Sequence, residues 1–244
     1  MRPIRRGNAP RPNDYADYKD AKPDLVARLG PYCSFCERPV VTQLAVDHIQ
    51  PKGLPAYAHL IGRWSNFLLA CVNCNSTKKD KDVDPANALL PDRDNTFAAF
   101  QYLPDGTVEP SANATDNGLN AIADGTLRLT GLHKAALNTP DENGKQVALD
   151  RKSQRMEAWL AAEEAKRDLQ NHPANHVLCD YIIKLAAKTG FFSVWMTVFA
   201  DNPTMLSRLI DAFTGTSGSG CFAANGDVVS PAPNPDALPG GGKI

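Results

Sequence analysis

The sequence predicts an α+β protein, in which a small unit of two strands and one helix precedes a β-hairpin and a mainly helical C-terminal half. Two C-x-x-C pairs enclose a short apolar strand pattern and precede a helix start. A Pro-Asp-Gly turn then separates two alternating runs, and apolar residues recur at helical spacing from residue 150 onward. The chain has 244 residues and is 43% hydrophobic, which is enough to bury an ordinary globular core.

Charge is distributed unevenly along the chain, although the net charge is only −1. Residues 1–80 carry 12 Lys and Arg against 7 Asp and Glu, and residues 81–244 carry 14 against 20. A basic segment joined to an acidic one suits a protein whose first part meets nucleic acid.

Residues 1–30 are expected to form a basic N-terminal arm and a short helix. The arm either contacts phosphates or is simply a solvated end; its arginines are Arg2, Arg5, Arg6 and Arg11. The stretch "AKPDLVARLG" reads as a helix because Pro23 lies near its start and Gly30 lies just past its end.

No apolar run follows the N-terminal charges, and no apolar stretch reaches the roughly 20 residues that a membrane helix needs. We therefore expect a cytoplasmic protein without a membrane partner. Disulfides are rare in that reducing compartment, so the paired cysteines indicate metal binding.

Four cysteines have the spacing of a structural zinc site. They are Cys33, Cys36, Cys71 and Cys74. Four thiolates complete a tetrahedral shell and leave no position for water, so this zinc would stabilise the fold and take no part in a reaction. The alternative is four free buried cysteines, and the paired spacing argues against it.

Polar residues with a catalytic character lie between and beside these cysteines. The strand "LAVDHIQPK" brings Asp47 and His48 side by side, although neighbouring strand residues point to opposite faces unless the strand end twists or bulges. Asn66 precedes a second apolar strand, and Asn75 follows the last cysteine at the start of a helix. A lone histidine at a strand end is more often structural than catalytic, but His48 has these polar residues beside it.

This pattern resembles the HNH endonucleases of the ββα-metal fold. The family has an acidic residue and a histidine on its first strand, an asparagine before its second strand, and a histidine or asparagine on the following helix. Asp47, His48, Asn66 and Asn75 match that order, and the resemblance covers about residues 33–81. Asn75 stands where many members have histidine, so this is the H-N-N variant. We expect residues 31–82 to form a zinc-stapled ββα-metal nuclease core.

The resemblance implies a role for each matched residue. His48 would be the general base, Asn66 would orient its loop, and Asp47 and Asn75 would bind one divalent ion. Both ligands offer hard oxygens, which favours Mg²⁺ or Mn²⁺. Four basic residues nearby would contact phosphates, although each alone could be part of a solvated face: Lys52, Arg63, Lys78 and Lys79.

The resemblance implies metal-dependent DNA cleavage that leaves a 5′-phosphate and a 3′-hydroxyl, as the family does. One alternative is an HNH enzyme that acts on RNA or only nicks, since the motif recognises a phosphodiester and not the sugar. An alternative of a different class is a zinc-stapled nucleic-acid-binding module without catalysis, in which His48 and Asn75 are structural.

We expect residues 83–149 to form the hairpin and a connecting region, 150–215 a helical region, and 216–244 a disordered Gly/Ser/Pro-rich tail. The run "FFSVWMTVF" reads as a buried helix or, alternatively, a partner-binding face. The stretches "LLPDRDNTFAAFQYLPDG" and "RKSQRMEAWLAAEE" resemble the nuclease subunits of Septu-type and retron-associated anti-phage systems. That resemblance implies an ATPase partner, which would dock on the helical half.

Overall fold

The protein combines helices with two small sheets, and the computed structural model describes residues 1–134 and 151–244. The expected boundary between residues 149 and 150 lies outside these described residues. Within them, no helix combines the length and the apolar character that crossing a bilayer requires.

The N-terminal helix α1 (Lys22–Leu29) has the predicted ends and follows the 3₁₀ helix η1 (Tyr18–Ala21). Proline lies in the first turn of α1, where its missing N–H interrupts no helical hydrogen bond. Gly30 ends the helix at φ 74°, a left-handed conformation that favours glycine. Leu25 and Leu29 are buried, so α1 packs through one face.

The two-strand unit forms next. Strand β1 (Ala45–His48) pairs antiparallel with β2 (Phe67–Ala70), and helix α2 (Val72–Lys78) follows β2 after a single residue. All four residues of β2 are buried, which explains its unbroken apolar run. The long connection between the strands contains the 3₁₀ helices η2 (Pro55–Leu60) and η3 (Trp64–Asn66).

The expected hairpin is present as β3 (Phe100–Tyr102) and β4 (Val108–Pro110), which pair antiparallel. The short elements η4 (Pro85–Asn87) and α3 (Thr96–Ala99) precede it, and α4 (Ala112–Asp116) follows it.

Helix α5 (Asn120–Thr130) packs against α2 and β4 and was not expected from the sequence. Its sequence "NAIADGTLRLT" contains one glycine and two threonines, which are weak helix formers. The hydroxyls of Thr126 and Thr130 donate back to helix carbonyls four residues earlier, at 2.8 and 3.0 Å. Both threonines are buried, so tertiary packing outweighs the low helix propensity.

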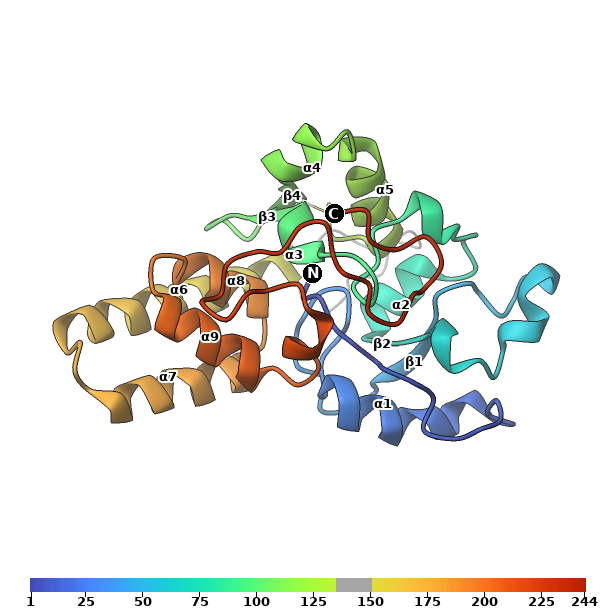
Figure 1. Cartoon of the computed structure of the whole chain (residues 1–244), viewed down its shortest axis with the longest axis horizontal. Helices are drawn as coiled ribbons and strands as arrows, with labels where there is room; N and C mark the ends of the chain where they lie inside the picture. The colour runs from blue at the N-terminus through green and yellow to red at the C-terminus, as the bar shows by residue number, and fades with distance from the viewer. Residues whose placement is uncertain (135–150) are drawn as a thin grey trace.

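The helical half consists of α6 (Arg151–Asn171), α7 (His176–Thr189), α8 (Phe192–Val198) and α9 (Pro203–Ala212). Helix α6 packs on α8, and α7 packs on α9. Figure 1 shows these helices on the opposite side of the molecule from α1, β1 and β2. Apart from the helical Thr197, residues 191–199 are buried, so this run belongs to the core and does not form an exposed partner-binding face.

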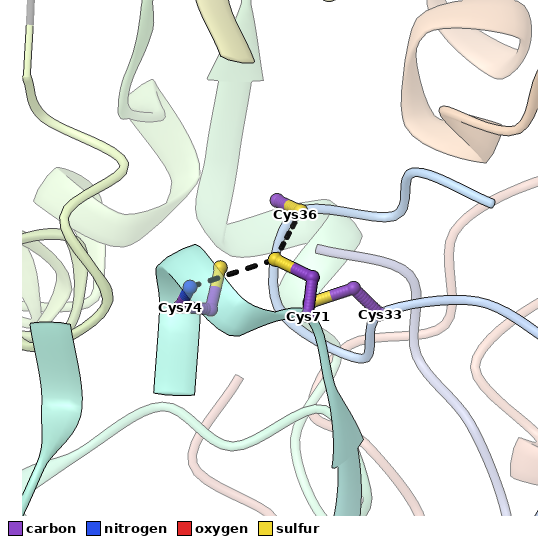
Figure 2. A group of neighbouring side chains, drawn as sticks. All are labelled: Cys33, Cys36, Cys71 and Cys74. Atoms are coloured by element: carbon purple, nitrogen blue, oxygen red, sulfur yellow. Dashed lines mark hydrogen bonds between the residues drawn. The ribbon is translucent and has the colours of Figure 1, made fainter. Parts of the chain in front are cut away.

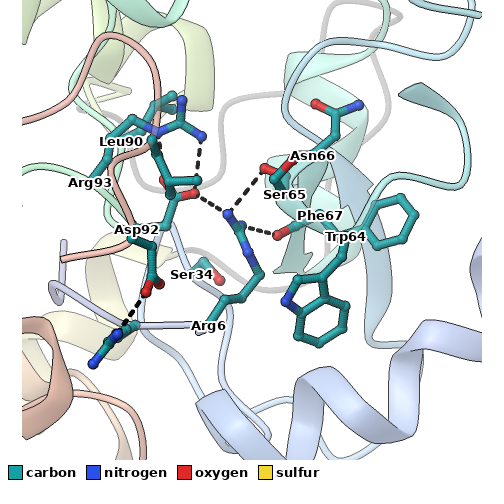
Figure 3. Close-up of polar contacts among 12 residues, drawn as sticks. Arg6, Ser34, Trp64, Ser65, Asn66, Phe67, Leu90, Asp92 and Arg93 are labelled. Atoms are coloured by element: carbon teal, nitrogen blue, oxygen red, sulfur yellow. Dashed lines mark hydrogen bonds and ion pairs between the residues drawn. The ribbon is translucent and has the colours of Figure 1, made fainter. Parts of the chain in front are cut away.

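Residues 1–4 and Arg6 are buried, which corrects the expectation of a solvated or phosphate-binding arm for Arg2 and Arg6, whereas Arg5 and Arg11 are exposed. The Arg2 guanidinium is buried, where it donates to the carbonyl oxygen of Thr214 at 2.7 Å and to that of Leu29 at 2.6 Å. Arg6 is also buried; it contacts the Asp92 carboxylate at 2.6 Å and the Ser65 carbonyl oxygen at 3.0 Å (Figure 3). Carbonyl and carboxylate acceptors bind the terminal guanidinium nitrogens of both arginines, which offsets much of the cost of burying them, although the buried Nε of Arg6 has no partner among the described residues.

Residues 216–244 also depart from the expectation, because they pack on the protein surface and include the 3₁₀ helix η5 (Ser217–Ser219). The Asn95 side-chain amide donates to the carbonyls of Cys221 and Val229, each at 2.8 Å. Gly226 has φ 88°, and a Cβ there would lie 2.4 Å from Leu206. Glycine here permits a close approach of the backbone, so the composition that suggested disorder instead supports tight turns.

Candidate functional site

The four predicted cysteines converge in space (Figure 2). Cys33 and Cys36 lie on the loop between α1 and β1, whereas Cys71 and Cys74 lie at the junction of β2 and α2. All four sulfur atoms lie within 4.8 Å of one another and all four residues are buried. Burial raises the pKa of the Cys33 thiol, so a bound cation would be needed to stabilise its thiolate. The donor set therefore fits one tetrahedral zinc ion.

Cationic side chains surround this cluster. The Arg151 guanidinium, at the start of α6, contacts the Cys74 sulfur at 3.2 Å and donates to the carbonyls of Thr130 and Gly131 at 2.9 and 2.8 Å. Burial by itself would lower the pKa of Arg151, but the negative charge of the cysteines outweighs it and raises that pKa. Arg38 is affected in the same way. Arg151 thus links the helical half to the cysteine cluster.

Asp47 lies near the end of β1 and has one carboxylate oxygen with a partner and one without. Its Oδ1 is 3.4 Å from the Lys78 ammonium, and its buried Oδ2 has no hydrogen-bond partner among residues 1–134 and 151–244. Burial raises the pKa of Asp47 to about 6, although the Lys78 charge acts in the opposite direction. A buried oxygen of this kind is costly unless a cation or donor satisfies it, so Asp47 fits the role of a metal ligand.

His48 follows directly and is fixed on three sides. Its Nε2 is 2.9 Å from the carbonyl oxygen of Ile61, and the rings of Tyr18 and Phe67 contact its imidazole edge-on, at centroid distances of 4.7 and 5.2 Å. A carbonyl oxygen only accepts, so Nε2 carries the proton and the neutral ring has its lone pair on Nδ1. Burial lowers the pKa of His48, which favours that neutral form.

Asn66 ties the long connection between the strands back to the end of β1. Its side-chain oxygen accepts from the Gln50 backbone N–H at 2.8 Å, and its amide donates to the Gln50 carbonyl at 3.0 Å and to the Leu60 carbonyl at 3.4 Å. Leu60 immediately precedes Ile61, whose carbonyl contacts His48. Asn66 can therefore position the histidine through the loop without touching it.

A groove of about 600 Å³ brings the catalytic candidates together. Asp47, His48 and Asn75 all line it. Asp47 and His48 therefore share one groove, although they are neighbours on strand β1, where successive side chains normally point to opposite faces. Asn75 is half-buried in the first turn of α2. Four lysines and the carboxylate of Asp80 also line the groove; the lysines are Lys19, Lys22, Lys52 and Lys79. The excess of positive charge suits a phosphate-containing substrate.

Two of the four predicted phosphate contacts need correction. Lys78 is only 1% exposed, and its ammonium contacts Asp47 and donates to the His48 carbonyl inside the protein. The sequence could not show that this lysine points inward while its neighbour Lys79 lies on the surface. Arg63 lies outside the groove lining, and its guanidinium pairs with Asp14 at 3.0 Å. Lys52 and Lys79 line the groove, and their contact with phosphates stays a prediction.

The sequence did not indicate the groove residues Tyr18, Lys19 and Lys22, and of these Tyr18 contacts His48. It lies 30 positions before His48, and no motif connects the two. Its hydroxyl accepts a hydrogen bond from the Lys52 ammonium at 2.7 Å, in addition to its ring contact with His48. Its position beside His48 is visible only in the folded structure.

The family model described as HNH endonuclease matches residues 33–81. This range contains all four clustered cysteines and the groove residues from Gln43 to Asp80, so the domain indicates a nuclease that acts on nucleic acid. No curated protein matches the chain. The matched range is about one fifth of the chain and does not include Tyr18, Lys19, Lys22 or the helical half.

Proposed function

We propose that this chain is a divalent-metal-dependent endonuclease that hydrolyses DNA phosphodiester bonds in the groove of Asp47, His48 and Asn75. The observation that carries the proposal is the buried, unpartnered Oδ2 of Asp47, in the same groove as a histidine with a fixed tautomer. The HNH match over the same residues supports it.

In this proposal His48 is the general base. Nε2 keeps its proton and donates a hydrogen bond to the Ile61 carbonyl oxygen, so Nδ1 accepts a proton from the attacking water. The lowered pKa of His48 leaves this nitrogen unprotonated near neutral pH. Asn66 keeps the loop that carries Ile61 in place, and therefore controls the orientation of the base.

Asp47 and Asn75 would hold one Mg²⁺ or Mn²⁺ ion through oxygen atoms. When bound, that ion supplies positive charge near the oxygen that leaves from the 3′ side, so the products would carry a 5′-phosphate and a 3′-hydroxyl. Lys78 fixes the first carboxylate oxygen of Asp47, so only Oδ2 is left for the ion. Lys52 and Lys79 would contact substrate phosphates. Cys33, Cys36, Cys71 and Cys74 would hold a structural zinc ion that stays outside the reaction.

Cleavage assays on supercoiled plasmid DNA and on an RNA of matched sequence test the proposal, each in Mg²⁺ and in EDTA. We expect DNA cleavage in Mg²⁺ and none in EDTA. Faster RNA cleavage would favour the RNA alternative, and accumulation of open circles alone would indicate a nicking enzyme. DNA binding without cleavage in either metal would favour the zinc-stapled binding module.

The metal-ligand role of Asn75 has its own test. Asn75→Ala should abolish cleavage while the zinc content and the melting temperature stay unchanged, because the residue is half-buried at a helix start. Asn73→Ala is the matched control, since Asn73 lies on the same helix but does not line the groove. Full activity of Asn75→Ala in Mg²⁺ would exclude this assignment.

We further propose that the nuclease is the effector of an anti-phage system and works with an ATPase subunit. The exposed face of α7 supports a docking role for the helical half, because Val177, Tyr181 and Leu185 recur at i, i+4 and i+8 and are 62%, 66% and 44% exposed. The full chain can be coexpressed with the ATPase encoded beside its gene and tested by pull-down. Replacing the three residues by serine should abolish capture of the ATPase, and unchanged capture would remove this face from the proposal.

A further inference from the structure

The 3₁₀ helix η1 forms one wall of the groove, although it lies outside the range matched by the nuclease family. Three of the residues in and just after η1 line the groove: Tyr18, Lys19 and Lys22. Both lysines are exposed and Tyr18 is half-buried. The backbone of this segment is fixed by the N-cap of η1, where the Asp17 carboxylate accepts from the Lys19 N–H at 2.9 Å.

Tyr18 touches two residues that the proposed reaction uses. Its ring contacts the His48 imidazole at a centroid distance of 4.7 Å and an interplanar angle of 69°, which is an edge-to-face geometry. Phe67 provides a second edge contact at 5.2 Å and 89°. With Nε2 tied to the Ile61 carbonyl, these two rings restrict the remaining freedom of the imidazole, which is tilting of its plane.

The hydroxyl of Tyr18 acts on a different residue. It accepts a hydrogen bond from the Lys52 ammonium at 2.7 Å. Lys52 is exposed, and a long exposed lysine side chain samples many rotamers unless a partner restricts it. The bond, together with the Tyr18 ring, whose centroid lies 4.1 Å from the same ammonium, therefore holds a positive charge at the groove wall beside His48.

We propose that Tyr18 is a positioning residue of the active site, whose ring orients His48 for proton transfer and whose hydroxyl orients Lys52 toward a substrate phosphate. This inference rests on the proposed nuclease function. It extends the active site beyond the HNH domain, so the matched residues 33–81 alone would be an incomplete enzyme.

Two substitutions separate the contribution of the Tyr18 ring from that of its hydroxyl. Tyr18→Leu removes both the ring and the hydroxyl, and should lower kcat roughly 10- to 100-fold, because small misplacement of a catalytic group has effects of that size. Tyr18→Phe keeps the ring and should leave kcat within about threefold while raising KM. Tyr57→Phe is the matched control: its hydroxyl bonds to Asp82 near the site, but Tyr57 does not line the groove, and its kinetics should equal those of wild type.

A double-mutant cycle tests whether the Tyr18 hydroxyl affects KM by holding Lys52. If the hydroxyl acts only by holding Lys52, then Tyr18→Phe combined with Lys52→Met should have the same KM as Lys52→Met alone. Independent, multiplicative effects of the two substitutions would overturn this part of the inference.

Nuclear magnetic resonance of the His48 imidazole tests the positioning role without any cleavage. Wild type and Tyr18→Phe should show the same Nε2-protonated tautomer and equally narrow imidazole lines, whereas Tyr18→Leu should keep that tautomer and broaden those lines, because the imidazole plane tilts more freely. If wild type cleaves nothing, the proposed function fails, and these spectra still decide the role of Tyr18. Unchanged His48 imidazole line widths in Tyr18→Leu would overturn the inference, and so would equal losses of kcat and of melting temperature in both Tyr18 variants.

Discussion

The four-cysteine cluster and the groove of Asp47, His48 and Asn75 are neighbours along the chain, yet they are built in opposite ways. The cluster is closed, because four buried sulfur atoms can fill the shell of one ion. The groove is open to solvent, and the Asp47 carboxylate that lines it keeps a buried oxygen for which the described residues provide no hydrogen-bond partner.

Within about 40 residues of the chain, one set of side chains is built to stabilise the fold and another is built to carry out the proposed reaction. Metal binding at a closed site contributes directly to folding free energy, because the unfolded chain has no such site. The open groove instead contains the Asp47 carboxylate, whose burial costs free energy until a ligand such as a cation binds it. Substitutions in the cluster should therefore lower the stability of the fold, and substitutions in the groove should lower the cleavage rate.

The largest expected effect is that of Cys71→Ser. Loss of one thiolate should release zinc and lower the melting temperature by roughly 10 °C, with activity lost as a consequence of unfolding. Cys179→Ser is the control, since Cys179 is buried on α7 and outside the cluster. Zinc content and thermal unfolding check the prediction, and a Cys71→Ser protein that retains zinc and stability would contradict it.

His48→Ala should show the opposite pattern. The rate should fall roughly 10²- to 10⁴-fold, the usual contribution of a general base, while zinc content stays unchanged. The melting temperature should fall by a few degrees at most. His59→Ala is the control, because His59 is exposed on η2 and does not line the groove. If His48→Ala melts as early as Cys71→Ser, the histidine is structural.

The cleavage rate should also depend on pH in a defined direction. Activity requires an ionised Asp47, whose pKa burial raises to about 6, and a neutral His48, whose pKa burial lowers. Both groups lose their protons as the pH rises, so the rate should increase from about pH 5 and level off near pH 7. Because a bound cation competes with the proton on Asp47, higher Mg²⁺ should move this rise to lower pH. Rate profiles at two Mg²⁺ concentrations check this, and a rate that falls over the same interval would contradict it.

The smallest effect is expected for Arg151→Gln, which tests whether the helical half stabilises the closed site. Loss of a charge-assisted contact to Cys74 should cost about 1–2 kcal/mol, lower the melting temperature by roughly 2–6 °C and speed zinc loss to a chelator. Arg167→Gln is the control, since Arg167 is exposed on the same helix. Equal zinc loss from both variants would contradict a role for Arg151.

The parts of the site that are local in sequence could be predicted. The C-x-x-C spacing and the strand that carries Asp47 and His48 are set by a few neighbouring residues, and these residues do share one groove or one cluster. The inward orientation of Lys78 could not be predicted, because helical spacing does not show which face is buried until its partner Asp47 is placed.

The contributions from distant segments also required the fold. Tyr18 reaches His48 only through the packing of η1 beside β1. Helix α5 contains residues that disfavour a helix, and contact with α2 and β4 compensates for them. Residues 216–244 have a composition typical of disorder, yet buried hydrogen bonds such as those from Asn95 tie them to the core.

Anomalous diffraction from a crystal soaked in Mn²⁺, recorded at the manganese and zinc absorption edges, tests the contrast between the two sites most directly. The account predicts a zinc peak among the four cysteines and a separate manganese peak about 2.2 Å from oxygen atoms of Asp47 and Asn75. A crystal with zinc among the cysteines and no manganese in the groove would contradict the proposed catalytic metal site and favour the zinc-stapled binding module.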